Sequence, residues 1–311
     1  MNRRATESRR GIACRWRGAA LATALAFLGG AAAEAQLLKP NLYPAPRESL
    51  RLFEMLRPLD APETLHSWSL SAGYQMSDLD SKTPGQRDRR TLHTGLASLN
   101  ARVGARGFAG LDLSYSGQDI DLLNRAMPIR ANVEERGLRL NGGAMVLPYL
   151  AVGATVGRSS LNGTYHFGVS PEDPSSGEIM SYGGFAALLY PAGDWKFSLT
   201  GAYSYDEGRQ SFADGVPREQ RSHLHVATTV FTALYSFAPR LDGVASLAWH
   251  HMIDERTVIP GRVSDEDWLR PTLGLVWRAS ERTSLLLFAS SYALNEAYDY
   301  AGLSAGLNYK F

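Results

Sequence analysis

Two short segments of the sequence hold the residue types that nucleophilic catalysis requires. They are Ser222-His223-Leu224-His225 and His250-His251, and a serine activated by a nearby histidine can hydrolyse an ester. If the segments lie on antiparallel strands joined by a turn at 238–240, His251 lies opposite about Thr228, with Ser222 several residues further along. A strand rises about 3.4 Å per residue, so Ser222 would be beyond hydrogen-bonding distance of His251. We therefore expect that the chain is not an enzyme and assign no catalytic residue.

The same histidines do not predict a metal site. His225 and His250 are expected on the same face of neighbouring strands, but about four residues apart in register and without a third ligand. The acidic residues near Asp80 do not have the spacing of a calcium loop, and no glycine-rich phosphate motif opens a helix. The single cysteine, Cys14, precedes the apolar run of the amino-terminal segment. We expect no metal and no cofactor.

The first 35 residues have the layout of a secretory signal peptide. Six arginines precede the apolar run at 19–28, and Ala33 and Ala35 are the small residues that cleavage requires. This apolar run is too short for a membrane helix, which needs about 20 apolar residues. We expect cleavage after Ala35, which also removes Cys14.

Removal of residues 1–35 changes the formal charge of the chain from +1 to about −3, because 26 basic and 29 acidic residues remain. A chain with this balance has no strongly basic surface for nucleic acid. We therefore expect no nucleic-acid partner.

The rest of the sequence alternates between apolar and polar residues in segments of about ten residues. Side chains along a strand point to opposite faces with a period of two, so each such segment predicts a strand with one apolar face. The first segment runs from Trp68 to Met76, and we expect twelve in all. The second changes phase after Leu96, which predicts a bulge near Ser98. In the eighth, we assign Leu224, Val226, Val230 and Leu234 to the outer, apolar face.

The connections between these strands alternate between short turns and longer loops. Such alternation, with an even number of strands, is typical of membrane-spanning β-barrels. Aromatic residues gather near both ends of the strands, including Trp268 toward the long loops, which predicts two girdles at the membrane interfaces. The short turns are expected at 104–107, 147–149, 191–194, 238–240 and 279–282. The longer loops are expected at 78–90, 118–135, 162–178, 206–221, 254–266 and 295–299.

The last nine residues, Leu-Ser-Ala-Gly-Leu-Asn-Tyr-Lys-Phe, place Leu303, Ala305, Leu307, Tyr309 and Phe311 on one face. This strand resembles the carboxyl-terminal strand of Gram-negative outer-membrane β-barrel proteins. The resemblance implies that Leu307, Tyr309 and Phe311 form an assembly signal for the barrel assembly machinery. It also implies outer-membrane lipids and lipopolysaccharide as partners.

The polar faces of the strands are expected to line the barrel interior, because an Arg or Lys facing lipid at mid-depth costs about 2–4 kcal/mol. Basic residues outnumber acidic ones among the assigned charges of this inner wall, which favours anions. The lumen-lining candidates are Arg102, Asp112, Arg139, Arg158, Lys196, His225, Asp242, His250, Arg270 and Arg278.

Residues 36–63 differ from the rest, since five prolines surround Leu52, Met55, Leu56 and Leu59 at helical spacing. One short amphipathic helix fits this pattern, and a disordered leader fits it equally well. As a helix the segment would plug the lumen, rest on the rim or bind a periplasmic partner. A twelve-stranded barrel with an inward helix resembles the autotransporter barrel, although only 28 residues stand in the place of a passenger domain.

The sequence therefore predicts an all-β protein with three parts: a signal peptide at 1–35, a periplasmic extension at 36–63 and a transmembrane, antiparallel, up-and-down barrel at 64–311. We expect it in the bacterial outer membrane. The preferred function is a passive, porin-like channel for small polar or anionic solutes. The alternative is a structural or surface-interaction barrel that acts through its loops, with a closed lumen. The third hypothesis is a lipid hydrolase of the outer membrane.

Overall fold

The computed structural model describes residues 68–81, 87–104, 106–123, 129–167, 173–213, 219–257, 267–293 and 298–311. The predicted signal peptide and the predicted extension at 36–63 lie outside these ranges. None of the described residues forms a helix that is long and apolar enough to cross a membrane.

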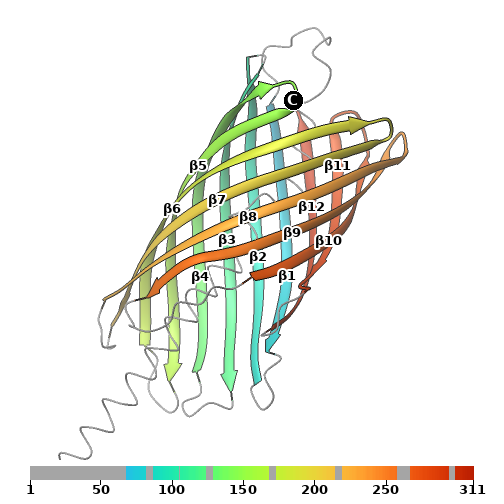
Figure 1. The fold of residues 1–311 in the computed structure, drawn as a ribbon. Coiled ribbons are helices and arrows are strands. Elements are labelled where there is room, and N and C mark those ends of the chain that lie inside the picture. Colours follow the sequence, from blue (N-terminus) through green and yellow to red (C-terminus); the bar gives the residue numbers. More distant parts are fainter. Residues whose placement is uncertain are drawn as a thin grey trace, which may run out of the picture.

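Twelve antiparallel strands form a closed barrel in which each strand pairs with its neighbours in the sequence (Figure 1). Strand β1 also pairs with β12, from Ser69 opposite Lys310 to Ser81 opposite Tyr298, so the sheet has no free edge. This confirms the predicted fold class and strand number. The strands are β1 Trp68–Ser81, β2 Arg87–Val103, β3 Gly107–Leu123, β4 Ile129–Leu147, β5 Leu150–Phe167, β6 Asp173–Ala192, β7 Trp195–Phe212, β8 Glu219–Ala238, β9 Leu241–Thr257, β10 Asp267–Arg278, β11 Thr283–Ser291 and β12 Tyr298–Lys310.

The two ends of the barrel differ in their connections, as the sequence predicted. At one end, which we call the short-turn end, tight turns join β2 to β3, β4 to β5, β6 to β7, β8 to β9 and β10 to β11. Gly104 and Gly193 have φ angles of 62° and 63° in two of these turns, a conformation that glycine adopts without strain. The opposite end is the long-loop end.

The strands extend further toward the long-loop end than predicted. Most of the stretches expected as loops at 118–135, 162–178 and 206–221 belong to strands, and β4 to β8 contain 18 to 20 residues each. A transmembrane strand needs only about 9–11 residues. The apolar alternation of each strand ends before the strand does, because backbone pairing continues beyond the last lipid-facing residue.

The predicted bulge near Ser98 was wrong. Strand β2 pairs with β1 and β3 in a continuous register, and Leu92 and Leu96 lie on the inner face while Leu99 and Val103 lie on the outer face. Leucines occur on the inner face in the first half of β2 and on the outer face in the second half. The apolar pattern therefore changes phase without a bulge in the backbone. The register shifts instead at Met145/Leu147 in β4 and at two places between β8 and β9.

Candidate functional site

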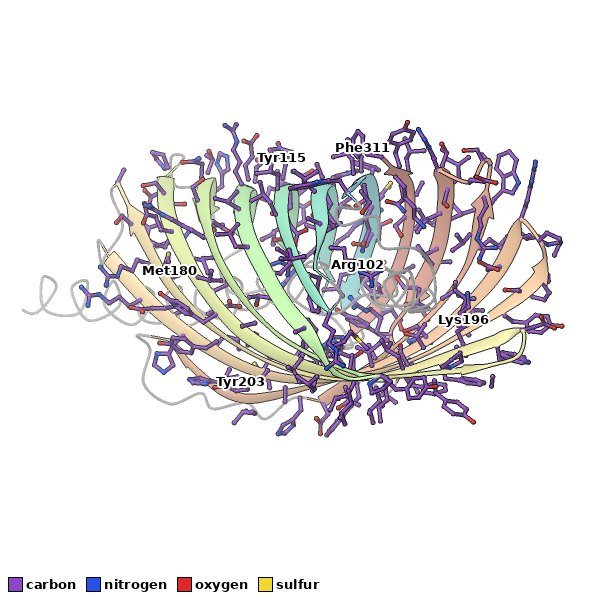
Figure 2. The ribbon with its side chains drawn as sticks, turned by 90° about the horizontal axis from the view of Figure 1, so that it is seen from above. Arg102, Tyr115, Met180, Lys196, Tyr203 and Phe311 are labelled. Carbon is purple, nitrogen blue, oxygen red and sulfur yellow. The ribbon has the colours of Figure 1, made fainter. Side chains whose placement is uncertain are left out.

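The inner face of the barrel holds most of the predicted lumen-lining residues. Figure 2 shows Arg102 and Lys196 inside the ring and Tyr115, Tyr203 and Phe311 outside it. The alternation of buried and exposed residues along each strand places the other side chains. Those on the inner face are Arg102, Asp112, Arg139, Lys196, Asp242, His250, Arg270 and Arg278.

Two of the predicted residues, Arg158 and His225, are on the outer face. Arg158 forms an ion pair with Glu178 on the neighbouring strand at 2.5 Å, and both side chains are more than half exposed. It shares its side of β5 with Val156, so its assignment to the lumen was wrong. The side chain of His225 is hydrogen-bonded to the Tyr203 hydroxyl, and its ring lies 4.7 Å from that of Tyr205.

The error at His225 concerns the whole of β8. Leu224, Val226, Val230 and Leu234 are buried on the inner face, each at most 3% exposed, whereas Phe231 and His225 are on the outer face. The sequence pattern predicts the two faces of this strand the other way round, and that prediction is wrong. Apolar residues occupy both sides of this strand, so the simple alternation did not distinguish them.

The middle of the inner wall carries a buried ionic network on β3 and β4. The Asp112 carboxylate is 3% exposed and accepts hydrogen bonds from Arg139 Nε and Asn141 Nδ2, each at 3.1 Å. Arg139 is itself only 17% exposed in its side chain. A buried carboxylate requires such partners, because an unpaired charge in a low dielectric is costly. This network holds two neighbouring strands together at mid-height.

Hydroxyl groups continue this polar layer on β8 and β9. Thr228 Oγ1 lies 3.1 Å from His250 Nδ1, and Thr232 donates to the Ser246 hydroxyl at 3.2 Å. The His250 ring stacks on Trp268, with centroids 5.0 Å apart and planes 16° apart. Trp268 is therefore on the inner face, and its predicted place in an outer aromatic girdle was wrong.

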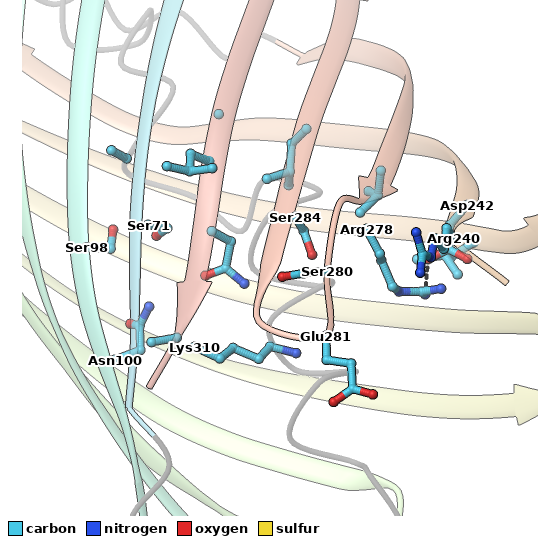
Figure 3. Close-up of a pocket in the computed structure, with 18 of the residues that line it drawn as sticks. Ser71, Ser98, Asn100, Arg240, Asp242, Arg278, Ser280, Glu281, Ser284 and Lys310 are labelled. Carbon is cyan, nitrogen blue, oxygen red and sulfur yellow. Dashed lines mark hydrogen bonds and ion pairs between the residues drawn. The ribbon is translucent and has the colours of Figure 1, made fainter.

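A cavity of about 610 Å³ lies inside the short-turn end (Figure 3). Four basic side chains line it, Lys196, Arg240, Arg278 and Lys310, with two acidic ones, Asp242 and Glu281. Small polar residues on β1, β2 and β12 form one part of the wall: Ser69, Ser71, Ser98, Asn100 and Asn308. Apolar residues on β8, β10 and β11 form another: Leu234, Val276 and Leu286.

Among the basic residues of this cavity, Arg278 is ion-paired with Asp242. Arg278 also donates to the Pro239 carbonyl at 3.2 Å. Among the described residues, the side chains of Lys196 and Arg240 have no ion-pair partner. The cavity therefore carries an excess of positive charge. Sequence reasoning missed Arg240 and Glu281, because turn residues do not follow the alternation of a strand.

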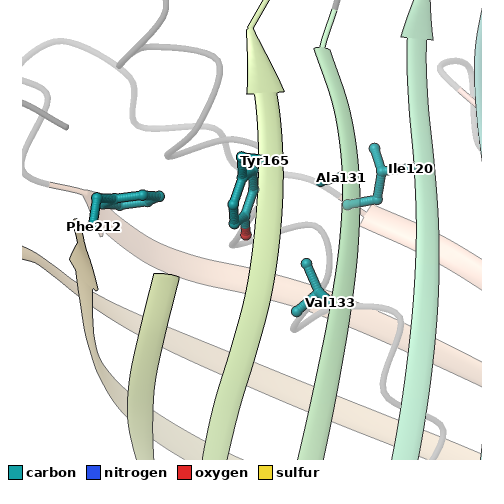
Figure 4. Close-up of a cluster of buried hydrophobic side chains, with 5 residues drawn as sticks. All are labelled: Ile120, Ala131, Val133, Tyr165 and Phe212. Carbon is teal, nitrogen blue, oxygen red and sulfur yellow. The ribbon is translucent and has the colours of Figure 1, made fainter. Parts of the chain in front are cut away.

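Three apolar clusters line the inner wall toward the long-loop end, and we call them together the apolar collar. The first comprises Ile120, Ala131, Val133, Tyr165 and Phe212 on β3 to β7 (Figure 4). The second comprises Leu224, Val226, Met252 and Trp268 on β8 to β10. The third comprises Leu79, Leu92 and Tyr300 on β1, β2 and β12, and Tyr292 packs against both the second and the third. The collar is not purely apolar, since Arg90, Asp173 and Asp206 are also buried at this end, each at most 8% exposed.

The outer face carries a band of exposed apolar side chains on every strand. Large residues such as Leu140, Leu273 and Leu303 are about half exposed or more, far beyond the apolar patches that soluble monomers expose. The predicted assembly-signal residues Leu307, Tyr309 and Phe311 are on this face, exposed by 44, 36 and 65%. Such an apolar exterior requires lipid or another apolar medium around it.

The candidate catalytic residues do not come together. Ser222 faces inward and His251 faces outward, and His251 pairs with Ala227 across β8, one residue from the position predicted. His251 Nδ1 lies 2.8 Å from the Asp267 carboxylate on β10. A histidine and a carboxylate are two parts of a hydrolytic triad, but no hydrogen bond joins His251 to a serine or threonine in the described residues.

The two histidines that were weighed as metal ligands lie on opposite faces of the sheet. His225 is on the outer face and His250 on the inner face. No group of three or more His, Cys, Asp or Glu residues in the described ranges is placed to hold a metal ion.

The barrel is similar to solved membrane-protein structures, although no family model and no curated protein matches the sequence. The translocator domain of the autotransporter NalP from Neisseria meningitidis has a TM-score of 0.69 and 15% identity, covering 86% of this chain and 95% of its own. The beta domain of the Bordetella autotransporter BrkA has a TM-score of 0.58 and 13% identity, covering 79% and 100%. An outer membrane channel from Pseudomonas putida F1 has a TM-score of 0.56 and 12% identity, covering 82% and 99%. At these identities the likeness shows the fold alone: the chain has the closed antiparallel barrel of outer-membrane translocators and channels.

Proposed function

We propose that this protein is a passive channel of the bacterial outer membrane with a preference for small anionic solutes. The observation that carries the proposal is the cavity at the short-turn end, in which four basic residues face two acidic ones. A ring of basic side chains at a pore mouth concentrates anions and repels cations. Anion preference had been predicted from a set that included Arg158, and it now rests on Lys196, Arg240, Arg278 and Lys310.

The apolar exterior supports the location. An apolar band about 25 Å tall, flanked by aromatic residues, is what the outer face of a bacterial barrel presents to lipid. Tyr115 and Tyr203 on the outer face toward the long loops, and Tyr190, Trp277 and Phe311 near the short turns, fit two aromatic girdles. Export by a cleaved signal peptide at 1–35 and recognition of the last strand by the assembly machinery are parts of the same proposal.

The outer face beyond the apolar band carries ion pairs in place of leucines. Arg130 pairs with Asp121 at 3.5 Å, and Arg158 with Glu178 at 2.5 Å. Arg136–Glu134 and Arg209–Glu207 pairs, both at 3.6 Å, lie on the same side of β4 and β7. These strand ends extend past the hydrocarbon, and we propose that the polar and phosphate groups of lipopolysaccharide surround them.

The proposal is tested by reconstituting the mature chain in planar bilayers. A channel gives discrete conductance steps in potassium chloride, and deletion of the tips of the long loops at 82–86 and 261–266 leaves the steps in place. A folded barrel that stays silent in both forms would overturn the channel. That outcome would favour the alternative, a barrel that acts through its loops.

A further inference from the structure

The cavity at the short-turn end has two chemically different walls. Leu234, Val276 and Leu286 form its apolar wall, and Leu234 and Val276 belong to a buried cluster with Val244 and Phe288, against which Leu286 packs. The polar wall consists of Ser69, Ser71, Ser98, Asn100 and Asn308.

These two sets of residues are only partly separated around the ring, because Leu286 on β11 is next to β12, which carries Asn308. The closed order of twelve strands places β2 half a ring away from β8, and β4 half a ring away from β10. Ser98 and Asn100 on β2 therefore lie across the cavity from Leu234 on β8, and all three line it. A molecule that fills the cavity meets hydrocarbon together with hydroxyl and amide groups, since Ser236 and Ser284 also line it on β8 and β11.

Some polar atoms of the cavity residues are not satisfied within the protein. Asn100 Oδ1 and Asp242 Oδ1 are buried atoms of cavity residues without a hydrogen-bond partner. Buried polar groups in proteins are nearly always satisfied by protein, water or ligand. Asn100 Oδ1 and Asp242 Oδ1 are acceptors, so they can bind a water molecule or a donor but not a carboxylate. An anion in the cavity must therefore be held by the basic side chains.

The volume of the cavity is that of a small-molecule site. At about 610 Å³ it falls within the range of about 300–1,000 Å³ found for ligand pockets, which combine apolar walls with a few placed polar groups. A pore that passes only hydrated inorganic ions has no use for an apolar wall beside its cations. The combination of Lys196 and Arg240 with Leu234, Val276 and Leu286 suits a molecule that is both anionic and apolar.

We infer that this cavity binds a small organic anion, a carboxylate with an apolar body, of which hexanoate and benzoate are the simplest examples. The carboxylate pairs with Lys196 and Arg240, and the hydrocarbon lies against Leu234, Val276 and Leu286. This inference rests on the proposed channel function and names the class of solute for it. Burial of one methylene group contributes about 0.8 kcal/mol, which is about a fourfold change in affinity.

The first test is block of the chloride current through the reconstituted channel by a series of carboxylates. Hexanoate should block at a concentration at least about tenfold lower than acetate, because four more methylene groups can be partly buried. Gluconate has the same charge and the same number of carbon atoms as hexanoate but carries hydroxyl groups, and it should block no better than acetate. Equal block by hexanoate, acetate and gluconate would overturn the inference while leaving the channel intact.

Two variants locate the site. Val276→Thr replaces a methyl with a hydroxyl at nearly the same volume and should raise the half-blocking concentration of hexanoate about two- to fourfold, with acetate unchanged. Val156→Thr makes the same change on the outer face of β5 and should change neither. If Val276→Thr and Lys196→Gln both leave hexanoate block unchanged, the cavity is not the site and the inference fails.

A second measurement does not depend on conduction. The fluorine NMR line of 4-fluorobenzoate should broaden on addition of the detergent-solubilised protein and sharpen again with excess hexanoate but not with excess gluconate. Binding by a barrel that conducts no ions would overturn the channel and support the site. A line that stays sharp would overturn the site, whether or not the barrel conducts.

Discussion

The two ends of the barrel lumen are built from different residues. Toward the long loops, the apolar collar packs Tyr165, Phe212 and Trp268 among aliphatic side chains. At the short turns, Lys196, Arg240, Arg278 and Lys310 line an open cavity. The collar packs the strand ends of the long-loop end, whereas the proposed role of the basic cavity is to select solutes. If the proposed channel function holds, substitutions in the collar should change stability and substitutions in the cavity should change selectivity.

The largest effect is expected from Trp268→Ala in the collar. Trp268 is 5% exposed and packs with Leu224, Val226 and Met252, so its removal leaves a cavity and should lower the free energy of unfolding by about 3–5 kcal/mol. The free energy of unfolding can be measured by titrating the protein with urea in lipid vesicles. Folded and unfolded protein are distinguished by their mobility on gels. A loss below about 1 kcal/mol would mean that the collar is not a packed element.

The next largest effect is expected from Arg139→Met at mid-height. It leaves the Asp112 carboxylate buried without its cationic partner, although Asn141 still donates to it. Breaking a buried ion pair in this way costs about 3 kcal/mol. The double variant Asp112→Leu/Arg139→Met should recover most of this loss, since no buried charge remains. A double variant as unstable as Arg139→Met would show that packing, and not the charge, determines the loss.

A smaller effect, on selectivity alone, is expected from Lys196→Gln at the short-turn end. Removal of one partly exposed charge, worth about 0.5–1 kcal/mol, should lower the chloride-to-potassium permeability ratio about two- to fivefold. The ratio should also fall as salt is raised from 0.1 M to 1 M, because the Debye length shortens from about 10 Å to about 3 Å. Reversal potentials at the two salt concentrations measure both effects.

The smallest effect is expected from Arg158→Gln, which makes the same change of charge on the outer face. Its partner Glu178 is more than half exposed, and exposed ion pairs contribute about 0–1 kcal/mol. The chloride-to-potassium permeability ratio should stay near that of the unsubstituted protein. The free energy of unfolding should also be nearly unchanged. A change in selectivity as large as that of Lys196→Gln would mean that Arg158 contributes to the pore.

The strands and turns were predictable because lipid enforces a strict alternation on one face of each strand. Val156, Leu247 and Leu275 mark that face, and the short turns follow from it. Where the strands leave the apolar band, the outer face becomes polar while residues such as Val133 and Phe212 make the inner face partly apolar. The lipid-facing alternation therefore ends there, and the sequence predicts loops for the continuation of β3 to β8. Arg158 was misplaced for the same reason, since it stands just past Val156 on the same face.

The inner wall was less predictable because the lumen is not uniformly polar. Leu224 and Val230 on β8 resemble lipid-facing residues but pack inside the barrel, while His225 and Phe231 lie outside. A packed interior admits apolar residues as readily as lipid does, so polarity alone does not distinguish the two faces of such a strand. The cavity also draws on Arg240 and Glu281 from turns, and turn residues have no strand periodicity.

The most direct test of the account is the reversal potential of the reconstituted channel across a potassium chloride gradient. The basic cavity predicts a potential displaced toward the chloride equilibrium value, and a smaller displacement after Lys196→Gln. A potential displaced toward the potassium value, in a barrel shown to be folded, would contradict the assignment of the short-turn cavity as an anion-selecting mouth.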